Sequence, residues 1–216
     1  SEGLHWAPKV KKLEEKYDLP SAWFIPSNRY SLKDEIIKTL TNFGEVGAHD
    51  TKHDGKLASL SKQVLIERLS DVRQTLKKRS ESHIHGFRAP LLQHNFQILE
   101  ALHTSGYAYD ASVPTWEPKH PYTMKAHGIG TVFPFKINGF PEVPLTLPQD
   151  HQMLHVLDLT PQQTIEAWMQ MMQEVKSVGG ICVFLTHPNE LANQKNQNVY
   201  EELLNNIVNQ KDTDTI

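Results

Sequence analysis

Short apolar runs alternate with amphipathic helical patterns along most of this chain, and this alternation constrains the fold more than any other feature of the sequence. Runs typical of buried strands occupy residues 21–26, 45–48, 83–87, 107–110 and 181–186. Repeated strand–helix units favour a mostly parallel sheet covered by helices. We therefore expect an α/β fold, either an open sheet or a closed or partly closed, distorted (β/α) barrel with its helices outside.

Helical patterns fill the intervals between these runs. Ser31, Ser59 and Thr160 stand where helix N-caps are expected. The apolar spacing predicts helices over residues 8–17, 31–43, 59–79, 95–104, 160–178 and 189–209. Residues 114–148 differ, because prolines, glycines and short β-prone pieces at 131–133 and 142–144 predict loops and irregular strands there. The sequence shows no repeat and no internal boundary, so we expect one domain over residues 1–216.

The composition argues against several classes of function. The formal net charge is −3 and there is no basic stripe, so nothing indicates a nucleic-acid partner. No apolar run approaches the roughly 20 residues that a membrane-spanning helix needs. Residues 1–8 lack the basic start and apolar centre of a signal peptide. The only cysteine, Cys182, lies in an apolar run and is expected to be a buried thiol, so no internal disulfide forms. We expect a soluble protein whose compartment and oligomeric state stay open.

Histidine is the unusual component, with 12 residues in a chain of 216. His49 and His53 stand four residues apart, a spacing that lets two imidazoles face one divalent metal ion if the backbone turns helically. His151 and His155 have the same spacing, and composition alone predicts about 0.7 such pairs. Spacing therefore does not choose between the two pairs. Gln152 stands where a His-Glu-x-x-His metalloprotease helix has glutamate, so we expect His151 and His155 at the surface or at the rim of a site.

Polar residues directly follow several of the predicted strands. Because the carboxyl ends of parallel strands meet at one edge of a sheet, these side chains are expected to converge. In chain order they are His49 with His53, Arg88, Asp110 with Ser112, and His187. This order is more specific than either histidine pair alone.

The same positions carry a family resemblance. The segment Gly47-Ala-His-Asp-Thr-Lys-His53 resembles the metal-binding motif of the polysaccharide deacetylase family, the NodB-homology domain of carbohydrate esterase type. Three further motifs follow in the family's order: Gly86-Phe-Arg-Ala-Pro90 is similar to its Arg-x-Pro motif, Tyr109-Asp-Ala-Ser112 with Trp116 to its later aspartate-containing segment, and Phe184-Leu-Thr-His-Pro188 to its closing Leu-x-His motif. The resemblance runs from about residue 5 to about residue 205, over nearly the whole chain.

The resemblance implies a metal-dependent hydrolase that removes acyl groups, typically acetyl, from an N- or O-acylated carbohydrate. A divalent ion, typically zinc, would polarise the acyl carbonyl and acidify a water. His49 and His53 would be metal ligands, and His187 would be the general acid. Asp110 would orient His187, since a carboxylate stabilises imidazolium, and Arg88 would pair with the catalytic base and hold it ionised.

The resemblance also implies a place for the substrate. Leu185 would line the small pocket for the acetyl methyl group. Pro90 belongs to the Arg-x-Pro motif beside that pocket. Trp116 is expected to stack on a sugar ring, although burial of its side chain fits the sequence nearly as well.

The start of the chain departs from the family pattern. The family's first motif, a strand ending in Asp-Asp-Gly, supplies both the base and the third metal ligand, and no such strand precedes the first helix here. One alignment places Gly3 on the motif's glycine, Glu2 on the metal-binding aspartate and Ser1 on the base. The alternative is that the strand lies upstream of Ser1.

Two other functions therefore stay open beside the deacetylase. One is a catalytically inactive relative that binds a glycan or a partner without turnover, which the missing acidic motif supports. The other is a metal-free hydrolase of the same fold that acts on a small cyclic amide.

Overall fold

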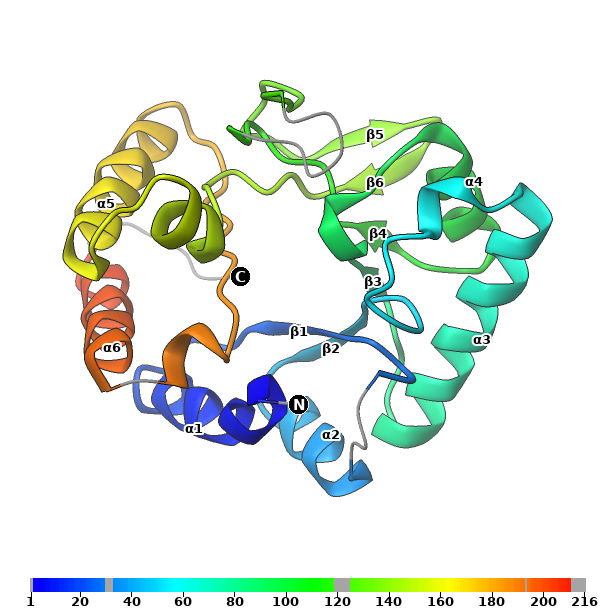
Figure 1. Cartoon of the computed structure of the whole chain (residues 1–216), viewed down its shortest axis with the longest axis horizontal. Coiled ribbons are helices and arrows are strands. Elements are labelled where there is room, and N and C mark those ends of the chain that lie inside the picture. Colours follow the sequence, from blue (N-terminus) through cyan, green and yellow to red (C-terminus); the bar gives the residue numbers. More distant parts are fainter. Residues whose placement is uncertain (1, 30–32, 119–124, 193, 211–216) are drawn as a thin grey trace.

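A computed structural model describes residues 2–29, 33–118, 125–192 and 194–210, and the side chains of residues 2–5 and 195 are not among the described parts. Helices surround a twisted sheet on its outer side (Figure 1). Strands and helices alternate along most of the chain, as the sequence predicts. The α/β fold with a mostly parallel sheet is thus confirmed.

The sheet has six strands in the order β1-β2-β3-β4-β6-β5. Its first five members in this order pair in parallel, and β5 pairs antiparallel with β6. The strands are β1 (Ala22–Ile25), β2 (Glu45–Ala48), β3 (Gly86–Phe87), β4 (Tyr109–Asp110), β5 (Phe135–Ile137) and β6 (Phe140–Glu142). The predicted strands at 21–26 and 45–48 are confirmed almost to the residue, whereas those at 83–87 and 107–110 are paired only over their last two residues.

The hairpin of β5 and β6 replaces the predicted strand pieces at 131–133 and 142–144. Its turn is Asn138-Gly139, and both residues have positive φ, at 50° and 81°. A two-residue turn of this kind matches the twist of antiparallel strands, and Asn-Gly is its strongest sequence signal. This local signal is more specific than the general β propensity on which the predicted strand pieces rest.

The helices are α1 (Glu2–Lys16), α2 (Asp34–Thr41), α3 (Lys62–Ser80), α4 (Phe96–Thr104), α5 (Pro161–Ser177) and α6 (Gln194–Val208). Asn95 caps α4 through Ile98 N–H at 2.8 Å, and Thr160 forms a capping box on α5, both at the predicted boundaries. The predicted start of the first helix at Pro8 is wrong, because α1 already begins at Glu2 and contains Pro8. Pro8 is the seventh residue of α1 and lies beyond its first turn, so its missing N–H removes one intrahelical hydrogen bond.

Two further helix starts also differ from the sequence prediction. Ser59 belongs to a short 3₁₀ helix, Leu57–Ser59, and α3 begins only after Ser61. The segment that contains Ser31 lies outside the described residues, and α2 begins at Asp34 after Lys33, which makes no side-chain cap.

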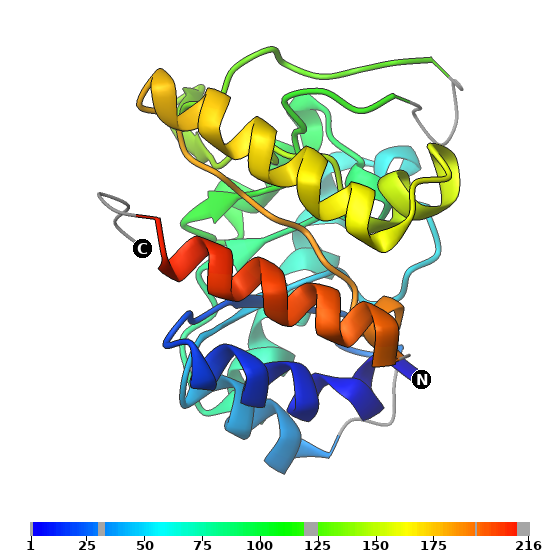
Figure 2. The same ribbon diagram turned by 90° about the vertical axis from the view of Figure 1, so that its left-hand side faces the viewer.

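Two apolar clusters hold the layers together. The larger one joins β2 and β3 to α2, α3 and α4, and includes the fully buried Ile37, Leu69 and Phe87. The second joins α1, α5 and α6, which lie side by side along one face of the molecule (Figure 2), with Trp168, Leu203 and Leu204 at its centre. Burial of these faces supplies most of the driving force for folding.

Residues 181–186 do not form the strand that the sequence predicts there. The backbone of this segment bonds instead to separate loops: Ile181 N–H donates to Val132 O at 3.0 Å, and Val183 N–H donates to the Thr146 hydroxyl at 2.7 Å. A side chain thus takes the place of a neighbouring strand, so no regular ladder arises and the sheet is not closed here. Cys182 within this segment is half-buried rather than buried as predicted. Within the described ranges, no helix has both the length and the apolar character needed to span a bilayer.

Candidate active site

Parallel pairing places the residue after each of three neighbouring strands at one edge of the sheet. His49 N–H donates to Ile25 O at 3.0 Å, Arg88 N–H to Ala48 O at 3.0 Å, and Ala111 N–H to Phe87 O at 2.8 Å. The ladder therefore continues for one residue beyond each strand. The structure brings His49, Arg88 and the end of β4 to the same level, as the sequence predicts.

The His49 and His53 rings lie together at this edge, with centroids 5.3 Å apart and planes tilted by 47°. His49 Nδ1 lies 2.7 Å from the carbonyl oxygen of Arg88. A carbonyl only accepts, so Nδ1 carries the proton and Nε2 keeps its lone pair. Metal-bound histidines are held in this way, with the second ring nitrogen donating to a backbone carbonyl.

The electrostatics of the pair suit neutral imidazoles. Burial lowers the pKa of His49 to about 3, against the opposing hydrogen bond to Arg88. Burial and the charge of Arg29 lower the pKa of His53 as well. Both rings are therefore uncharged at neutral pH, which is the state in which imidazole binds a metal. These residues fit the metal that the family resemblance implies.

Asp50 anchors the loop that carries the two histidines. Its side chain is 1% exposed and accepts two hydrogen bonds from Arg68 of α3, Nε at 2.7 Å and Nη2 at 2.6 Å. Its φ of 61° is a left-handed conformation that aspartate tolerates better than most residues. Asp50 is thus a fixed support of this loop.

A third metal ligand does not join His49 and His53 among the residues whose side chains are described. The three-residue cluster with metal-ligating geometry in that part of the chain consists of His151, His155 and Glu190 instead. Glu2, the ligand predicted from the alignment, is the first residue of α1, and its side chain lies outside the described residues.

Arg88 extends across the end of β4. Its Nε donates to Ala111 O at 2.8 Å, and its guanidinium lies over the Phe24 ring, 4.6 Å from the centroid. Burial lowers the pKa of Arg88 to about 10, so the side chain stays charged at neutral pH. That charge acts on Tyr109, Asp110 and Glu142.

Asp110 is fully buried and takes part in a polar network at the end of β4. The Ser112 hydroxyl donates to Asp110 Oδ1 at 2.6 Å and accepts from Ala89 N–H at 2.8 Å. Ser112 therefore links the ends of β3 and β4 by local hydrogen bonds. On its other side Asp110 faces Glu142, its register partner on β6, and Asp110 Oδ2 and Glu142 Oε2 are buried oxygens without a hydrogen-bond donor in the part of the chain that the structure describes.

Two neighbouring buried carboxyl groups cannot both ionise, and burial raises the pKa of both Asp110 and Glu142. Burial and the charge of Asp110 raise the pKa of Glu142 to about 10. Glu142 is therefore the protonated member at neutral pH. Its Oε1 also accepts from Val113 N–H at 2.9 Å. The sequence prediction did not single out Glu142, whose only signal was an acidic residue in a β-prone segment.

The predicted contact between Asp110 and His187 is wrong. His187 Nδ1 lies 2.6 Å from Asp150 Oδ1, and His187 N–H donates to Asp150 Oδ2 at 2.5 Å. Asp110 instead faces Ser112 and Glu142, because Asp110 and Glu142 are register partners on the adjacent strands β4 and β6. Burial opposes protonation of His187, but Asp150 outweighs it and raises the pKa of His187 above its ordinary value.

His187 and Arg88 lie close enough to the histidine pair to affect its charge. The positive forms of both side chains lower the pKa of His49, and the positive form of His187 also lowers that of His53. The structure therefore brings together four of the predicted residues around one edge, with Asp150 as an addition that the sequence prediction missed. Asp150 lacked a signal because it follows no predicted strand.

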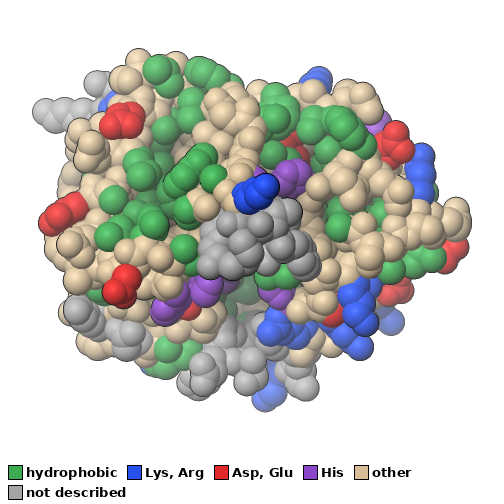
Figure 3. Space-filling model, turned by 45° about the horizontal axis from the view of Figure 1, so that its top comes forward, with side chains coloured by type: hydrophobic (Ala, Val, Ile, Leu, Met, Phe, Trp, Pro, Cys, Tyr) green, Lys and Arg blue, Asp and Glu red, His purple; other side chains and the backbone are tan. Residues whose placement is uncertain are grey.

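The three predicted substrate contacts have different environments. Leu185 is buried in a small apolar cluster with Leu92 and Leu145. Pro90 is buried at the start of a 3₁₀ helix, Pro90–Leu92. Trp116 is 52% exposed, so stacking on a ligand is sterically open to it. On the face shown in Figure 3, hydrophobic side chains gather on the left, and histidines reach the surface between them and the basic side chains at lower right.

Part of the chain matches known proteins in sequence. A sequence profile of the family described as polysaccharide deacetylase matches residues 3–109. The chain is 31% identical over 110 residues to a peptidoglycan deacetylase of Helicobacter pylori, a match that covers 49% of this chain and 36% of that protein. The matched region is therefore only about a third of the length of this relative.

Solved structures share the fold. A Mycobacterium smegmatis protein assigned as a polysaccharide deacetylase superposes with a TM-score of 0.81 at 18% identity, covering 99% of this chain and 74% of that one. The Puue allantoinase gives 0.72 at 14% identity, with coverages of 99% and 68%. A CE4 family pseudoenzyme from Bacillus anthracis gives 0.62 at 11% identity, with coverages of 94% and 56%. At these identities the likeness concerns the fold alone.

Proposed function

This chain belongs to the polysaccharide deacetylase family, and we propose that it hydrolyses acetyl groups from an N- or O-acylated carbohydrate with the help of a bound divalent metal ion, zinc being our choice. One observation carries this proposal. A pair of neutral imidazoles, His49 and His53, lies within electrostatic reach of a histidine that Asp150 keeps easily protonated, His187. A metal-ligand pair beside a proton donor is the arrangement that amide or ester hydrolysis needs.

His49 and His53 are the residues that we propose as metal ligands, with Glu2 as the third. A divalent ion held there supplies Lewis acidity, which polarises the acyl carbonyl and makes a water more acidic. The hydrogen bond from His49 Nδ1 to Arg88 O fixes the orientation of the first ligand. Asp50 and Arg68 fix the loop that carries both ligands.

His187 is the general acid in this proposal. Expulsion of an amine requires a proton, and the raised pKa of His187 keeps that proton available at neutral pH. Asp150 holds Nδ1 of the ring, so Nε2 is the atom that can deliver the proton to the leaving group. Asp150 is a positioning residue, because it acts through His187.

Arg88 contributes a fixed positive charge beside this reaction centre. Its guanidinium is held by Ala111 O and by the Phe24 ring, so its position does not depend on substrate. The buried pair of Asp110 and Glu142 carries one negative charge behind it. We propose that Arg88 orients the acidic base of the reaction and that Asp110 keeps Arg88 in place.

The substrate class follows from the exposed apolar side chains and from the family. Trp116, Ile129 and Phe133 are each about half exposed, and an exposed aromatic ring such as that of Trp116 can stack on a sugar ring. The H. pylori relative is named a peptidoglycan deacetylase. An N-acetylated amino sugar is therefore the first substrate to test, with Leu185 beside the acetyl methyl group.

The deciding experiment measures acetate released from N-acetylated amino-sugar oligosaccharides by the zinc-loaded protein. The His49→Ala/His53→Ala variant should lose both bound zinc and activity. A matched control is His83→Ala/His85→Ala, which removes two neighbouring exposed histidines whose rings are 5.8 Å apart. Full activity in the His49→Ala/His53→Ala variant would contradict the proposal.

A glycan-binding role without turnover is the second candidate. It is favoured by the absence of a third ligand or an acidic base beside His49 and His53 among the described side chains. The same assay separates the two, because a binding protein retains the oligosaccharide in equilibrium dialysis but releases no acetate. Including a small cyclic amide in the assay tests the remaining alternative, hydrolysis of that class of ring.

A further inference from the structure

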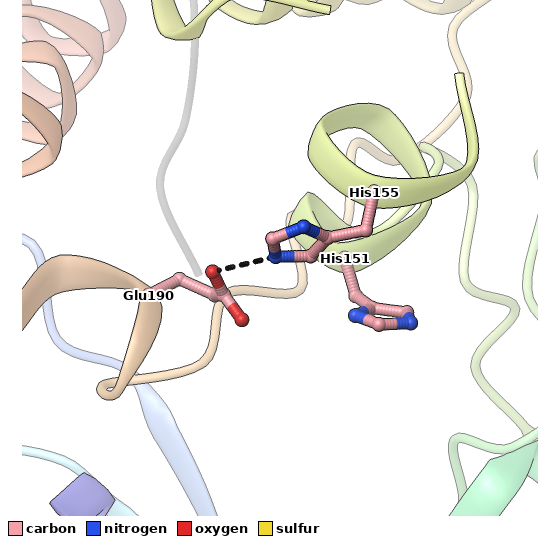
Figure 4. Close-up of side chains that lie close together, drawn as sticks. All are labelled: His151, His155 and Glu190. Carbon is pink, nitrogen blue, oxygen red and sulfur yellow. Dashed lines mark hydrogen bonds and ion pairs between the residues drawn. The ribbon is translucent and has the colours of Figure 1, made fainter. Parts of the chain in front are cut away.

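His151, His155 and Glu190 form a second cluster of metal-ligating side chains, on a different part of the fold. His151 precedes the π-helix Gln152–Val156 and His155 lies within it, whereas Glu190 begins the 3₁₀ helix Glu190–Ala192. One ligand atom from each residue lies within 4.8 Å of the other two. Two segments more than 30 residues apart in the chain thus supply one compact group of donors (Figure 4).

The geometry is close to that of a bound ion. His155 Nε2 lies 3.0 Å from Glu190 Oε2, and the two imidazole centroids are 5.1 Å apart. Donor atoms around a tetrahedral zinc ion are about 3.3 Å apart, given metal–ligand distances near 2.0–2.1 Å. His155 and Glu190 already have this separation. The His151 donor lies within 4.8 Å of both of these atoms, and its side chain is exposed.

The surroundings orient the donors. Buried side chains of Gln152 and Met153 face the interior, so the neighbouring histidines project outward. The Asn189 side-chain amide donates to Glu190 Oε1 at 3.2 Å, which leaves Oε2 directed at His155. The Asn196 amide holds the Glu190 backbone carbonyl at 2.6 Å. Such outer contacts are typical of ligands that are fixed before the metal binds.

We propose that His151, His155 and Glu190 form a second divalent-cation site, of the zinc type, distinct from His49 and His53. Two imidazoles and one carboxylate are a donor set that suits zinc and neighbouring transition metals rather than magnesium or calcium. Three protein ligands leave one position open to water. The site stands independently of the deacetylase proposal, since none of its ligands is shared with it.

An ion bound by these three residues would connect two segments of the proposed active site. Asp150 directly precedes His151, and the Glu190 N–H donates to the carbonyl of His187 at 2.9 Å. A metal bound by His151, His155 and Glu190 therefore joins the segment that carries Asp150 to the segment that carries His187. It stabilises the contact between these two residues at the rim of the proposed active site.

The test is zinc binding to chelator-stripped protein, measured by calorimetry with Zn²⁺ alone as the probe. In the His49→Ala/His53→Ala background we expect one remaining zinc per chain. Adding His151→Ala/His155→Ala should abolish it, and adding Glu190→Gln, which keeps the side-chain shape, should weaken it at least tenfold. Adding His83→Ala/His85→Ala should leave it unchanged. Circular dichroism checks that each variant is folded.

Two results would overturn the second site. One is zinc binding that is unchanged by both the double alanine variant and Glu190→Gln. The other is equal loss in the His83→Ala/His85→Ala control, which would indicate general histidine binding at the surface. Either result leaves the deacetylase proposal intact, because its metal depends on His49 and His53.

Discussion

The carboxylate of Asp150 holds His187 at two points, with Oδ1 2.6 Å from the ring Nδ1 and Oδ2 2.5 Å from the backbone N–H. Ring and backbone are therefore fixed by one side chain, 37 residues earlier in the chain. The carboxylate is nearly buried, whereas 41% of the His187 side chain is exposed. The His187 ring is therefore hydrogen-bonded to Asp150 through Nδ1 and partly exposed to solvent, which suits it to pass a proton to a bound molecule.

Replacing Asp150 by asparagine should lower the pKa of His187, because the ion pair is what raises it. A histidine with a raised folded pKa stabilises the fold below its unfolded pKa, and this contribution disappears as the pH rises through the folded value. Asp150→Asn removes that contribution. It should also shift the basic limb of the activity profile to lower pH and reduce kcat roughly tenfold to hundredfold.

The pH profile and an NMR titration of the His187 ring measure this effect. Asp110→Asn is the informative comparison, since Asp110 makes no contact with His187 and should leave the ring's titration close to that of the wild type. A His187 pKa that follows Asp110 and not Asp150 would contradict the assignment.

Replacing Arg68 by methionine should loosen the loop that carries His49 and His53. It leaves the nearly fully buried Asp50 carboxylate without its two hydrogen bonds, which costs about 2–4 kcal/mol of unfolding free energy. Zinc affinity should fall about tenfold or more, as for other residues that orient metal ligands. Denaturant unfolding and calorimetric zinc titration measure the two effects.

A matched control for Arg68→Met is Lys62→Ala in the same helix. It breaks an ion pair with Glu100 whose side chains are both about half exposed, and such pairs contribute little to stability. The double variant Asp50→Asn/Arg68→Met should recover part of the lost stability. Equal effects of Arg68→Met and Lys62→Ala would rule out a special role for the buried pair.

Replacing Glu142 by glutamine should be nearly neutral for stability at pH 7, within about 1 kcal/mol. Glu142 is the protonated partner of Asp110, and glutamine likewise carries no charge and donates a hydrogen bond. Glu142→Leu removes the donor and leaves Asp110 charged and poorly paired, so it should destabilise the fold markedly. Infrared spectra offer a direct check, because the carbonyl band of a protonated carboxyl group at pH 8 should vanish in Glu142→Gln. Persistence of that band would assign the proton elsewhere.

Replacing Glu14 by glutamine should stabilise the protein at alkaline pH. Burial raises the pKa of Glu14 from 4.5 to about 7, so unfolding is favoured as the pH rises between these values, by roughly 3 kcal/mol in all. Glutamine can still accept the hydrogen bonds from Ser21 and Tyr200. Thermal melts at pH 4.5 and pH 8 should show a smaller difference in Tm for the variant than for the wild type. An unchanged difference would show that other groups cause the pH dependence.

Local sequence signals predicted the elements whose ends depend on neighbouring residues. The strands at 22–25 and 45–48 are runs of apolar residues bounded by proline, glycine or charge, and the start of α5 is fixed by Thr160 and Gln163. The hairpin turn Asn138-Gly139 was equally local and could have been found. The order of His49, Arg88, Asp110 and His187 at successive strand ends followed from the same alternation.

The tertiary structure alone decided which of these side chains meet. Asp110 and Asp150 are both acidic and both precede His187, and no spacing rule distinguishes them. Their surroundings do: β4 directs Asp110 toward Glu142 on β6, while the loop after Leu147 brings Asp150 to His187. The same holds for residues 181–186, whose strongly apolar sequence predicts a strand but whose neighbours offer loops and a threonine hydroxyl in place of a ladder. A sequence determines local conformation through neighbouring residues, but a contact between distant segments depends on how the layers pack.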